Sequence, residues 1–210
     1  MSLLEDMKEA TIKGNANKSV ELANQAIVEG IDANEIIQNG LIAAMAEVGE
    51  RFKLGLIYVP EMLIAARAMQ AALKVVKPYL KGEEIKGLAT IVIGTVKGDL
   101  HDIGKNLVGI MLEGAGCVVI DLGVDVPVDK FVVAVQEHKP QFLGLSALLT
   151  TTMPQMGLTI KALEQAGLRQ QVKVLVGGAP VTQRFADEVG ADGYASDAAT
   201  VVDKIKRLLV

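Results

Sequence analysis

Asp99, His101 and Gly104 are the residues whose types and spacing are best suited to chemistry. They stand in the stretch TVKGDLHDIGKN, which runs from residue 95 to residue 106. A histidine that binds a metal needs its other ring nitrogen held by a hydrogen bond, commonly to a carboxylate, and Asp99 is close enough to His101 to accept that bond. The missing Cβ of Gly104 would allow the backbone to approach a bulky ligand or to adopt a positive φ. The spacing therefore indicates a metal-competent histidine, although it is also typical of a loop histidine beside a helix-capping aspartate.

The position of this stretch predicts the first strand-to-helix loop of an α/β domain. It follows an apolar run at 88–94 and precedes an amphipathic run at 103–114. Strands are predicted at 89–94, 117–121, 142–147, 172–176 and 193–195, and helices at 103–114, 128–138, 153–167, 181–189 and 198–209. This alternation predicts a five-stranded parallel sheet with helices on both faces. Because no Gly-x-Gly-x-x-Gly follows the first strand, a flavodoxin-like strand order is favoured over a dinucleotide-binding one.

Other loops should lie at the same edge of this sheet. The loop after the third strand, 144–152, is rich in hydroxyl side chains, and the loop after the fourth contains the glycine pair 177–178. Each feature has an ordinary explanation, since Thr152 could cap a helix and Pro127 and Pro180 could begin helices. Because loops after parallel strands meet at one edge, together they predict a rim with a metal-competent histidine, hydroxyls and a glycine floor open to a long ligand.

Residues 1–80 show helical periodicity instead. Four helices joined by short loops are predicted, so this segment should form a four-helix bundle with its methionines in the core. Asp32 has the spacing of a helix cap, and Pro60 suits the first turn of the fourth helix. Residues 81–87 are polar and flanked by glycine, which predicts a linker between a helical domain at 1–80 and the α/β domain at 88–210.

The composition indicates a globular protein without a nucleic-acid or membrane partner. The 210 residues are 50% hydrophobic, and the net charge of −4 gives no basic footprint for nucleic acid or for an anionic membrane. The N-terminus lacks the basic and apolar regions of a signal peptide, and no apolar run reaches the roughly 18 residues of a spanning helix, so a cytoplasmic location is expected. The single cysteine, Cys117, excludes an intrachain disulfide and a Cys/His metal cluster, and its apolar context predicts a buried side chain.

Three motifs stand in order at the ends of predicted strands. They are Asp99-x-His101-x-x-Gly104, Ser146-x-Leu148 and Gly177-Gly178. Together they resemble the cobalamin-binding domain of corrinoid-dependent methyltransferases and of cobalamin-dependent methionine synthase. The N-terminal bundle is similar to the helical cap that precedes this domain, so the resemblance covers essentially the whole chain. It implies a cofactor that is cobalamin or a related cobamide, bound base-off.

The resemblance also implies a role for each matching residue. His101 would be the lower axial ligand of cobalt in place of the cofactor's own base, Asp99 would bond to the far nitrogen of His101, and Thr152 would complete that relay. Tyr58 falls where the family places an aromatic residue, often Phe, over the upper, methyl-bearing face of the corrinoid. The remaining contacts to the cofactor would come from Asp102, Gly104, Ser146, Leu148, Thr150, Gly177 and Gly178.

The function implied by the resemblance is that of a methyl carrier, not of a complete enzyme. Co(I) would accept a methyl group from a donor through a partner methyltransferase. Methyl-Co(III) would then pass the group to a second methyltransferase that uses tetrahydrofolate or a thiol, and a reductive activator would be a further partner. The segment 81–87 would be the hinge that lets the cap move aside.

Three other classes of protein share parts of the pattern. The cobalamin-binding subunit of an adenosylcobalamin-dependent mutase has the same Asp-x-His-x-x-Gly motif but does not need the helical cap. A cobalamin-sensing regulator would carry basic DNA-binding helices, whereas this bundle is acidic. A flavodoxin-like signalling domain would need a clustered acidic pocket, for which Asp99 and Asp102 are candidates.

Overall fold

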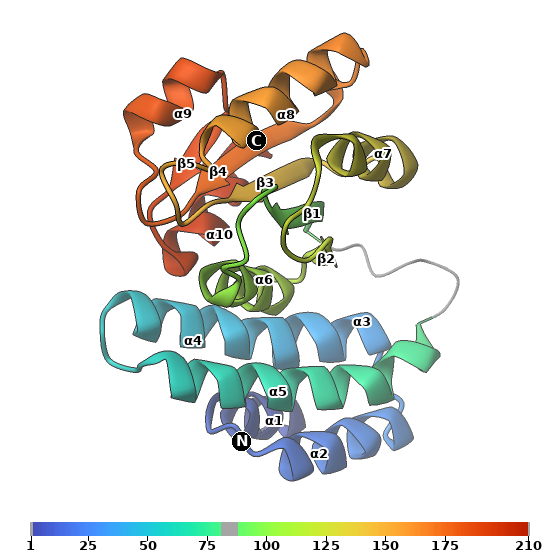
Figure 1. Cartoon of the computed structure of the whole chain (residues 1–210). Helices are drawn as coiled ribbons and strands as arrows, with labels where there is room; N and C mark the ends of the chain where they lie inside the picture. Colours follow the sequence, from blue (N-terminus) through green and yellow to red (C-terminus); the bar gives the residue numbers. More distant parts are fainter. Residues whose placement is uncertain (1, 81–87, 210) are drawn as a thin grey trace. The chain divides into compact units, whose positions relative to one another are not determined.

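A computed structural model describes residues 2–80 and 88–209 of the chain (Figure 1). The chain divides into two compact units. The first holds the described residues before 88 together with Gly114–Gly116, and the second holds the remaining residues. The predicted linker and hinge at 81–87 lies outside the described residues.

The first unit contains the four predicted helices. Its elements are α1 (Leu3–Ile12), α2 (Ala16–Val28), α3 (Ala33–Glu35), the π-helix η1 (Ile36–Ile42), α4 (Ala43–Lys53), α5 (Val59–Val76) and the 3-10 helix η2 (Lys77–Tyr79). As predicted, Asp32 caps α3, because its carboxylate accepts the N–H of Asn34 at 2.9 Å, and Pro60 lies in the first turn of α5. The helix predicted between Asp32 and the next connector is present, but the π-helix at its centre was not predicted.

Methionines fill the core of this unit, as the sequence predicts. The buried ones are Met7, Met45, Met62 and Met69. A flexible, unbranched thioether adapts to irregular gaps between helices, which suits a bundle with few aromatic side chains.

The second unit is the predicted α/β domain. Its strands are β1 (Thr90–Thr95), β2 (Val118–Asp121), β3 (Phe142–Ser146), β4 (Lys173–Gly177) and β5 (Gly193–Ala195). They form one parallel sheet in the order β2-β1-β3-β4-β5, which confirms the flavodoxin-like order. The strand order reverses at β1 and β3, so the loops that follow these two strands border the crevice where such sheets bind ligands.

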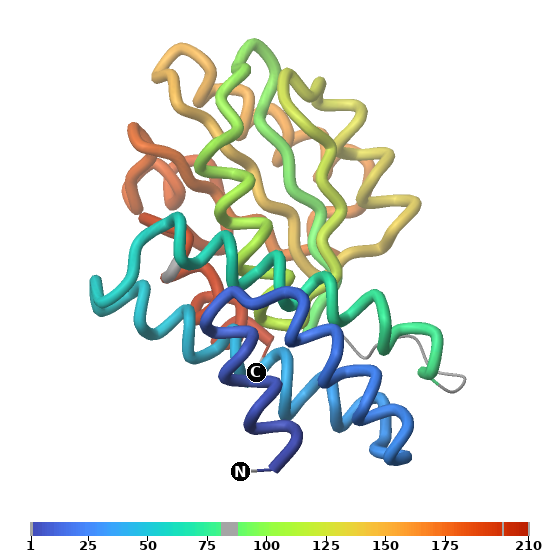
Figure 2. Tube along the Cα trace, turned by 90° about the horizontal axis from the view of Figure 1, so that it is seen from below, coloured from blue at the N-terminus to red at the C-terminus, as the bar shows by residue number. Residues whose placement is uncertain are grey.

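Helices cover both faces of the sheet (Figures 1 and 2). They are α6 (Ile103–Gly114), α7 (Val128–His138), α8 (Pro154–Gln165), α9 (Gln183–Val189) and α10 (Ala198–Leu208), with a 3-10 helix η3 (Arg169–Gln171) before β4. Because side chains alternate along a strand, β1 contributes to two separate cores. Val92 packs with Phe131 of α7 on the face covered by α7, α8 and α9, whereas Ile91 and Ile93 pack with Ile205 of α10 on the face covered by α6 and α10.

Two local predictions are wrong. Thr152 does not cap α8, because its hydroxyl donates to Asp99 and to the carbonyl of Leu149 and accepts no amide of the helix. Pro180 does not begin α9, which starts behind a different cap, Thr182. Both residue types suit a helix start, but Thr152 bonds to Asp99 and Pro180 lies in the loop before α9.

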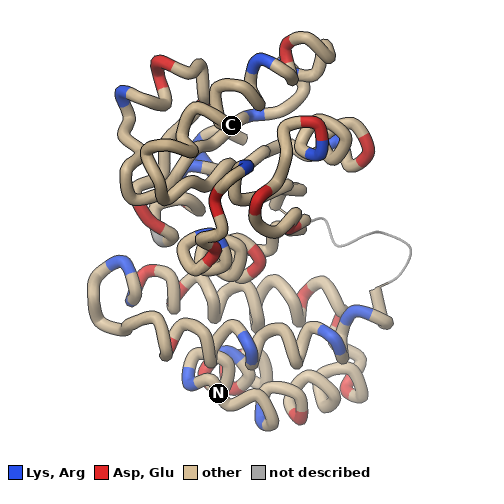
Figure 3. Tube along the Cα trace, in the orientation of Figure 1, with Lys and Arg blue, Asp and Glu red and all other residues tan. Residues whose placement is uncertain are grey.

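Surface and composition features agree with the sequence. Charges of both signs are interspersed along both units (Figure 3). Cys117 is buried, as predicted, and burial raises the pKa of its thiol to about 11. Among residues 2–80 and 88–209, no helix combines the length and the apolar character needed to cross a membrane.

Candidate functional site

Asp99 is the buried centre of the loops at the carboxyl edge of the sheet. Its Oδ1 accepts the backbone N–H of His101 at 3.1 Å and lies 2.7 Å from the ring Nδ1 of His101. Its Oδ2 accepts the N–H of Leu148 at 2.8 Å, the N–H of Leu149 at 3.2 Å and the hydroxyl of Thr152 at 2.8 Å. One carboxylate therefore joins the loop after β1 to the loop after β3.

These hydrogen bonds decide the ionisation of Asp99. Burial by itself would raise the pKa of the carboxyl group. The ring and N–H of His101, the N–H of Leu148 and the hydroxyl of Thr152 together outweigh burial, and they hold the pKa of Asp99 well below its ordinary value. Asp99 is therefore a permanent anion at neutral pH, although it is fully enclosed.

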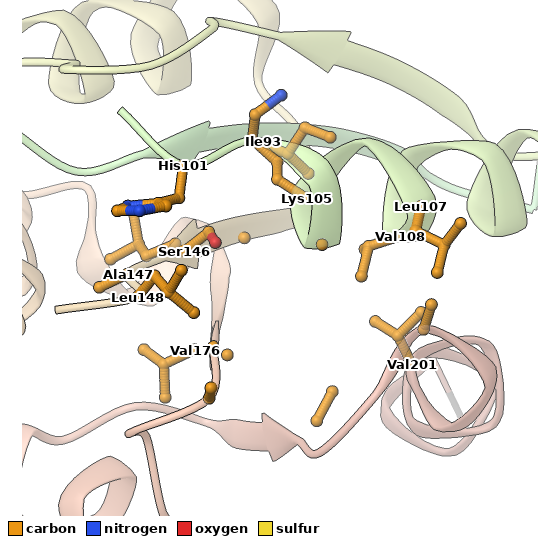
Figure 4. A pocket seen from close by; sticks show the side chains of 18 of the residues that line it. Ile93, His101, Lys105, Leu107, Val108, Ser146, Ala147, Leu148, Val176 and Val201 are labelled. Atoms are coloured by element: carbon orange, nitrogen blue, oxygen red, sulfur yellow. The ribbon is translucent and has the colours of Figure 1, made fainter. Parts of the chain in front are cut away.

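His101 extends from this buried anion to the edge of a cavity (Figure 4). An ionised carboxylate can only accept, so in the neutral ring Nδ1 carries the hydrogen and the lone pair is left on Nε2. No residue in the described ranges 2–80 and 88–209 forms a hydrogen bond with Nε2. The side chain of His101 is 52% exposed whereas that of Asp99 is 0% exposed. The ring is therefore fixed at Nδ1 by a buried carboxylate and accessible at Nε2.

The cavity beside His101 has a volume of about 690 Å³. Its walls come from the start of α6, the loop after β3, the end of β4 and the junction of β5 with α10. Val108, Leu148 and Val201 are among the apolar side chains that face it, and Ser146 and Leu148 lie on the side of His101 (Figure 4). Its volume and its apolar lining with few polar groups are typical of a site for a large organic ligand.

Two glycines shape this cavity for different reasons. Gly178 has a φ of +132°, and a Cβ there would lie 1.8 Å from the carbonyl oxygen of Ala147, so the backbone at this point excludes every other residue. Gly104 does not have a positive φ, so that alternative is wrong, and a Cβ there would meet no atom within 4 Å. The absence of a side chain at Gly104 therefore leaves space open beside the cavity and relieves no clash.

The structure brings most of the predicted site residues together. Asp99, His101 and Thr152 form one hydrogen-bonded cluster. The predicted residues that line the cavity are His101, Asp102, Gly104, Ser146, Leu148, Gly177 and Gly178. Thr150 is exposed and does not line it, and Tyr58 belongs to the helical unit, where its side chain is 68% exposed. The roles of Thr150 and Tyr58 remain predictions.

Several residues of the site were not found by sequence reasoning. The amide of Leu149 binds Asp99, but a backbone donor leaves no signal in the sequence. Thr95 donates its hydroxyl to the carbonyl of His101 at 2.9 Å, and a hydroxyl at the end of a buried strand was the available clue. Lys105 is 5% exposed and lines the cavity, and a lone lysine on an apolar helix face was the corresponding clue.

Comparison with known proteins identifies the family. A model described as a B12 binding domain matches residues 89–203, and a second model with the same description matches residues 3–77. The chain is 45% identical over 205 residues to trimethylamine corrinoid protein 1 from Methanosarcina acetivorans, covering 97% of this chain and 95% of that protein. It is 45% identical over 212 residues to dimethylamine corrinoid protein 1 from Methanosarcina mazei, covering 99% and 96% of the two chains.

A solved structure agrees with these relatives. The methanol:cobalamin methyltransferase complex MtaBC from Methanosarcina barkeri contains a chain that matches with a TM-score of 0.91 at 31% identity, over 99% of this chain and 79% of that one. The fold and the site thus define a protein with a helical N-terminal region and a Rossmann-like B12-binding domain. The chain belongs to the corrinoid proteins of methyltransferase systems, which confirms the family predicted from the three motifs.

Proposed function

We propose that this chain binds a corrinoid in the base-off form and carries a methyl group on it between two methyltransferases. The observation that carries the proposal is the pair of Asp99 and His101, in which Nδ1 is held by a buried carboxylate while Nε2 is open beside the cavity. The bound corrinoid would supply the cobalt centre that accepts and releases the methyl group.

The residues present fit such a cofactor. Nε2 of His101 is the nitrogen that can serve as the lower axial ligand, since Nδ1 is already bonded. The apolar walls suit the flat base that the histidine would displace, and the open space at Gly104 leaves room for it. Ser146 and Leu148 would hold the displaced tail beside the glycine pair 177–178.

Asp99 would control how strongly His101 binds the metal. Its negative charge would make the imidazole a stronger donor to a cobalt centre held at Nε2. Because the pKa of Asp99 is lowered, the hydrogen between Oδ1 and Nδ1 belongs to the ring and not to the carboxylate. Thr152 would moderate the effect, because its hydroxyl bonds to Oδ2 and takes up part of the same charge.

The relatives support a carrier in place of a mutase subunit. Two of them are named for trimethylamine and dimethylamine, and the matching solved structure is a complex of a methyltransferase. The partners of this chain would be a substrate-specific methyltransferase on the donor side and a methyltransferase that uses tetrahydrofolate or a thiol on the acceptor side. A reductive activator would restore a cofactor that has become oxidised.

The proposal is tested by reconstitution. The chain is refolded with hydroxocobalamin, freed of excess cofactor by gel filtration and examined by visible absorption, together with His101→Ala and His138→Ala. His138 is the other histidine of the chain and lies at the end of α7, so it is a matched control. We expect one bound corrinoid per chain in the wild type, an altered axial-ligand spectrum in His101→Ala and an unchanged spectrum in His138→Ala.

Carriage of the methyl group is measured separately. The reconstituted chain is reduced, treated with radiolabelled methyl iodide and passed through gel filtration, and the label should elute with the protein. A colourless protein after reconstitution, or a His101→Ala spectrum identical to that of the wild type, would contradict the proposal.

A further inference from the structure

The loop from Asp121 to Val126 contacts the His101 loop along much of its length, although none of its residues belongs to the three motifs. We propose that this loop is a template that positions His101 for axial ligation, with Asp125 as its principal positioning residue. The inference rests on the proposed ligation by His101. It assigns the position of that ligand to residues 121–126, a described segment that forms no hydrogen bond with the ring.

Asp125 forms hydrogen bonds with two consecutive residues of the Lys-Gly-Asp turn, Gly98 and Asp99. Its Oδ1 accepts the N–H of Gly98 at 2.7 Å, and its own N–H donates to the carbonyl of Asp99 at 2.9 Å. The residue before Asp99 and Asp99 itself are thus fixed by one neighbour. Because Asp99 holds the ring of His101, a shift of this turn would be transmitted to the ring.

The backbone of Asp125 is in a strained conformation. Its φ is +52°, a value that non-glycine residues rarely adopt, and only one other non-glycine residue among residues 2–80 and 88–209 has a positive φ, Lys139 at +44°. Aspartate and asparagine tolerate this region better than other residues do. Such strain persists when the surroundings over-determine the conformation, and here it directs the N–H and the carboxylate of one residue toward the same turn.

The template loop makes further bonds to the end of β1. The carbonyl of Gly123 accepts the N–H of Thr95 at 2.9 Å, and the N–H of Val126 donates to the carbonyl of Thr95 at 3.0 Å. Thr95 in turn donates its hydroxyl to the carbonyl of His101. The template therefore reaches His101 through Thr95 as well as through Asp99.

An ion pair between a buried ammonium and an exposed carboxylate holds the other end of the His101 loop. The ammonium of Lys105, in the first turn of α6, pairs with Oδ2 of Asp121 and donates to Oδ1 of Asn106 at 2.7 Å. Figure 4 shows the Lys105 nitrogen on the side away from the cavity. The ammonium therefore binds Asp121 of the template loop, whereas the aliphatic stem of Lys105 lines the cavity. Oδ1 of Asp121 accepts the N–H of Gly123 at 2.9 Å, which ties this ion pair to the rest of the loop.

Substitutions at Asp125 test the contribution of its carboxylate. Asp125→Gly keeps the positive φ and loses the carboxylate, whereas Asp125→Asn keeps both a tolerated backbone and an acceptor oxygen. Lys105→Met keeps an apolar stem and removes the charge. Lys139→Gly is the matched control, because it relieves the other positive φ, at the end of α7, where Lys139 forms no hydrogen bond with the described residues of the His101 loop.

Two readouts are taken on the full-length chain. The first is amide hydrogen exchange of Gly98 and His101 by NMR without cofactor. The second is the ratio of histidine-ligated to unligated cobalt(II) by EPR after reconstitution with hydroxocobalamin and one-electron reduction. We expect Asp125→Gly to exchange about tenfold faster and to lower the ratio about three- to tenfold, since outer partners of a metal ligand change affinity by about 10- to 100-fold and this loop acts one step farther out. Lys105→Met should lower the ratio about threefold, and Asp125→Asn and Lys139→Gly should match the wild type.

The outcomes distinguish this inference from the function on which it rests. Unchanged exchange in Asp125→Gly would overturn the template, whatever the cofactor does. Faster exchange with an unchanged ligation ratio would also overturn it, because the order of the loop would then not reach the ring. A wild type without histidine ligation would refute the proposed function, and it is visible before any variant is made.

Discussion

Two carboxylates at opposite edges of the same sheet are stabilised in different ways. Asp192, at the amino edge before β5, lies 2.8 Å from a guanidinium nitrogen of Arg169 and 3.5 Å from the ammonium of Lys173, and it accepts the N–H of Val174. Asp99, at the carboxyl edge, takes its five hydrogen bonds from three amides, one hydroxyl and one imidazole.

The two carboxylates differ in whether the charge of the partner side chain can change. Arginine and lysine remain charged, so the charge of Asp192 is matched permanently and serves the fold. The only ionisable partner of Asp99 within the described chain is His101, and histidine is a side chain that can be neutral or positively charged. The charge of Asp99 is thus not cancelled by a permanent cation, so it can act on a ligand through His101. The carboxylates at the two edges should therefore respond differently to substitution.

The largest effect is expected from removing each carboxylate in turn. Asp99→Leu leaves three amides without their acceptor around a buried side-chain position, so the free energy of unfolding should fall by about 3–5 kcal/mol. Asp192→Leu frees cations that can return to water, so a loss of about 1–2 kcal/mol is expected. Urea unfolding of both variants measures the difference, and equal losses would remove the distinction drawn here.

The next effect is the dependence of stability on pH that the lowered pKa of Asp99 produces. The pKa of Asp99 is lowered in the folded chain, so between that value and about 3.9, the ordinary value of an unfolded aspartate, the unfolded state binds more protons than the folded state does. The stability contributed by Asp99 is therefore complete above about pH 4 and is lost as the pH falls toward the folded pKa, at about 1.4 kcal/mol for each unit of pKa difference. Urea unfolding at pH 6 and pH 3 should show a smaller acid loss in Asp99→Asn than in the wild type. An equal loss in both proteins would mean that the folded pKa of Asp99 is not lowered.

A smaller effect is expected for the hydroxyl that bonds to Asp99. Thr152→Val preserves shape and removes one donor from the carboxylate, so the free energy of unfolding should fall by about 1–2 kcal/mol. Thr159→Val is the control, since Thr159 is also buried but its hydroxyl bonds back to the carbonyl of Gln155 within α8. We expect a change within about 0.5 kcal/mol for the control. Similar losses in the two variants would show that Asp99 does not depend on this hydroxyl.

The smallest change in stability should accompany a clear change in binding. Gly104→Ala places a methyl group in open space near the start of a helix, so stability should be unchanged or higher by up to about 1 kcal/mol. Hydroxocobalamin should bind more weakly, because the added group occupies space beside the cavity. Thermal unfolding and equilibrium dialysis measure the two effects. Unaltered binding would show that the open space at Gly104 is not used by the ligand.

Most of the fold could be predicted from the sequence. Alternating short apolar runs and helical segments determine a parallel sheet, and the observed strands begin and end within one or two residues of the predicted ones. The π-helix from Ile36 to Ile42 was missed because the spacing of apolar residues does not distinguish one wide turn from a regular helix.

Of the interactions in the site, the sequence predicted only those between side chains that are close in sequence or that belong to the recognised motifs. The spacing of Asp99 and His101 predicted their bond, which the structure contains. The amides of Leu148 and Leu149 and the pairing of Lys105 with Asp121 could not be predicted, because they depend on how β1, β2 and β3 are placed side by side. A hydroxyl before a helix is most often a cap, so only the family resemblance predicted that Thr152 joins Asp99 and His101, and the structure contains its bond to Asp99.

The central claim, that His101 binds cobalt through Nε2, is tested most directly by EPR with isotopic labelling. The chain is produced with natural or ¹⁵N-labelled histidine, reconstituted with hydroxocobalamin and reduced to cobalt(II). The account predicts that the nitrogen splitting changes from three lines to two on labelling and disappears in His101→Ala but not in His138→Ala. A three-line splitting that persists with labelled histidine would show that the cofactor's own base occupies the axial position, and it would contradict the account.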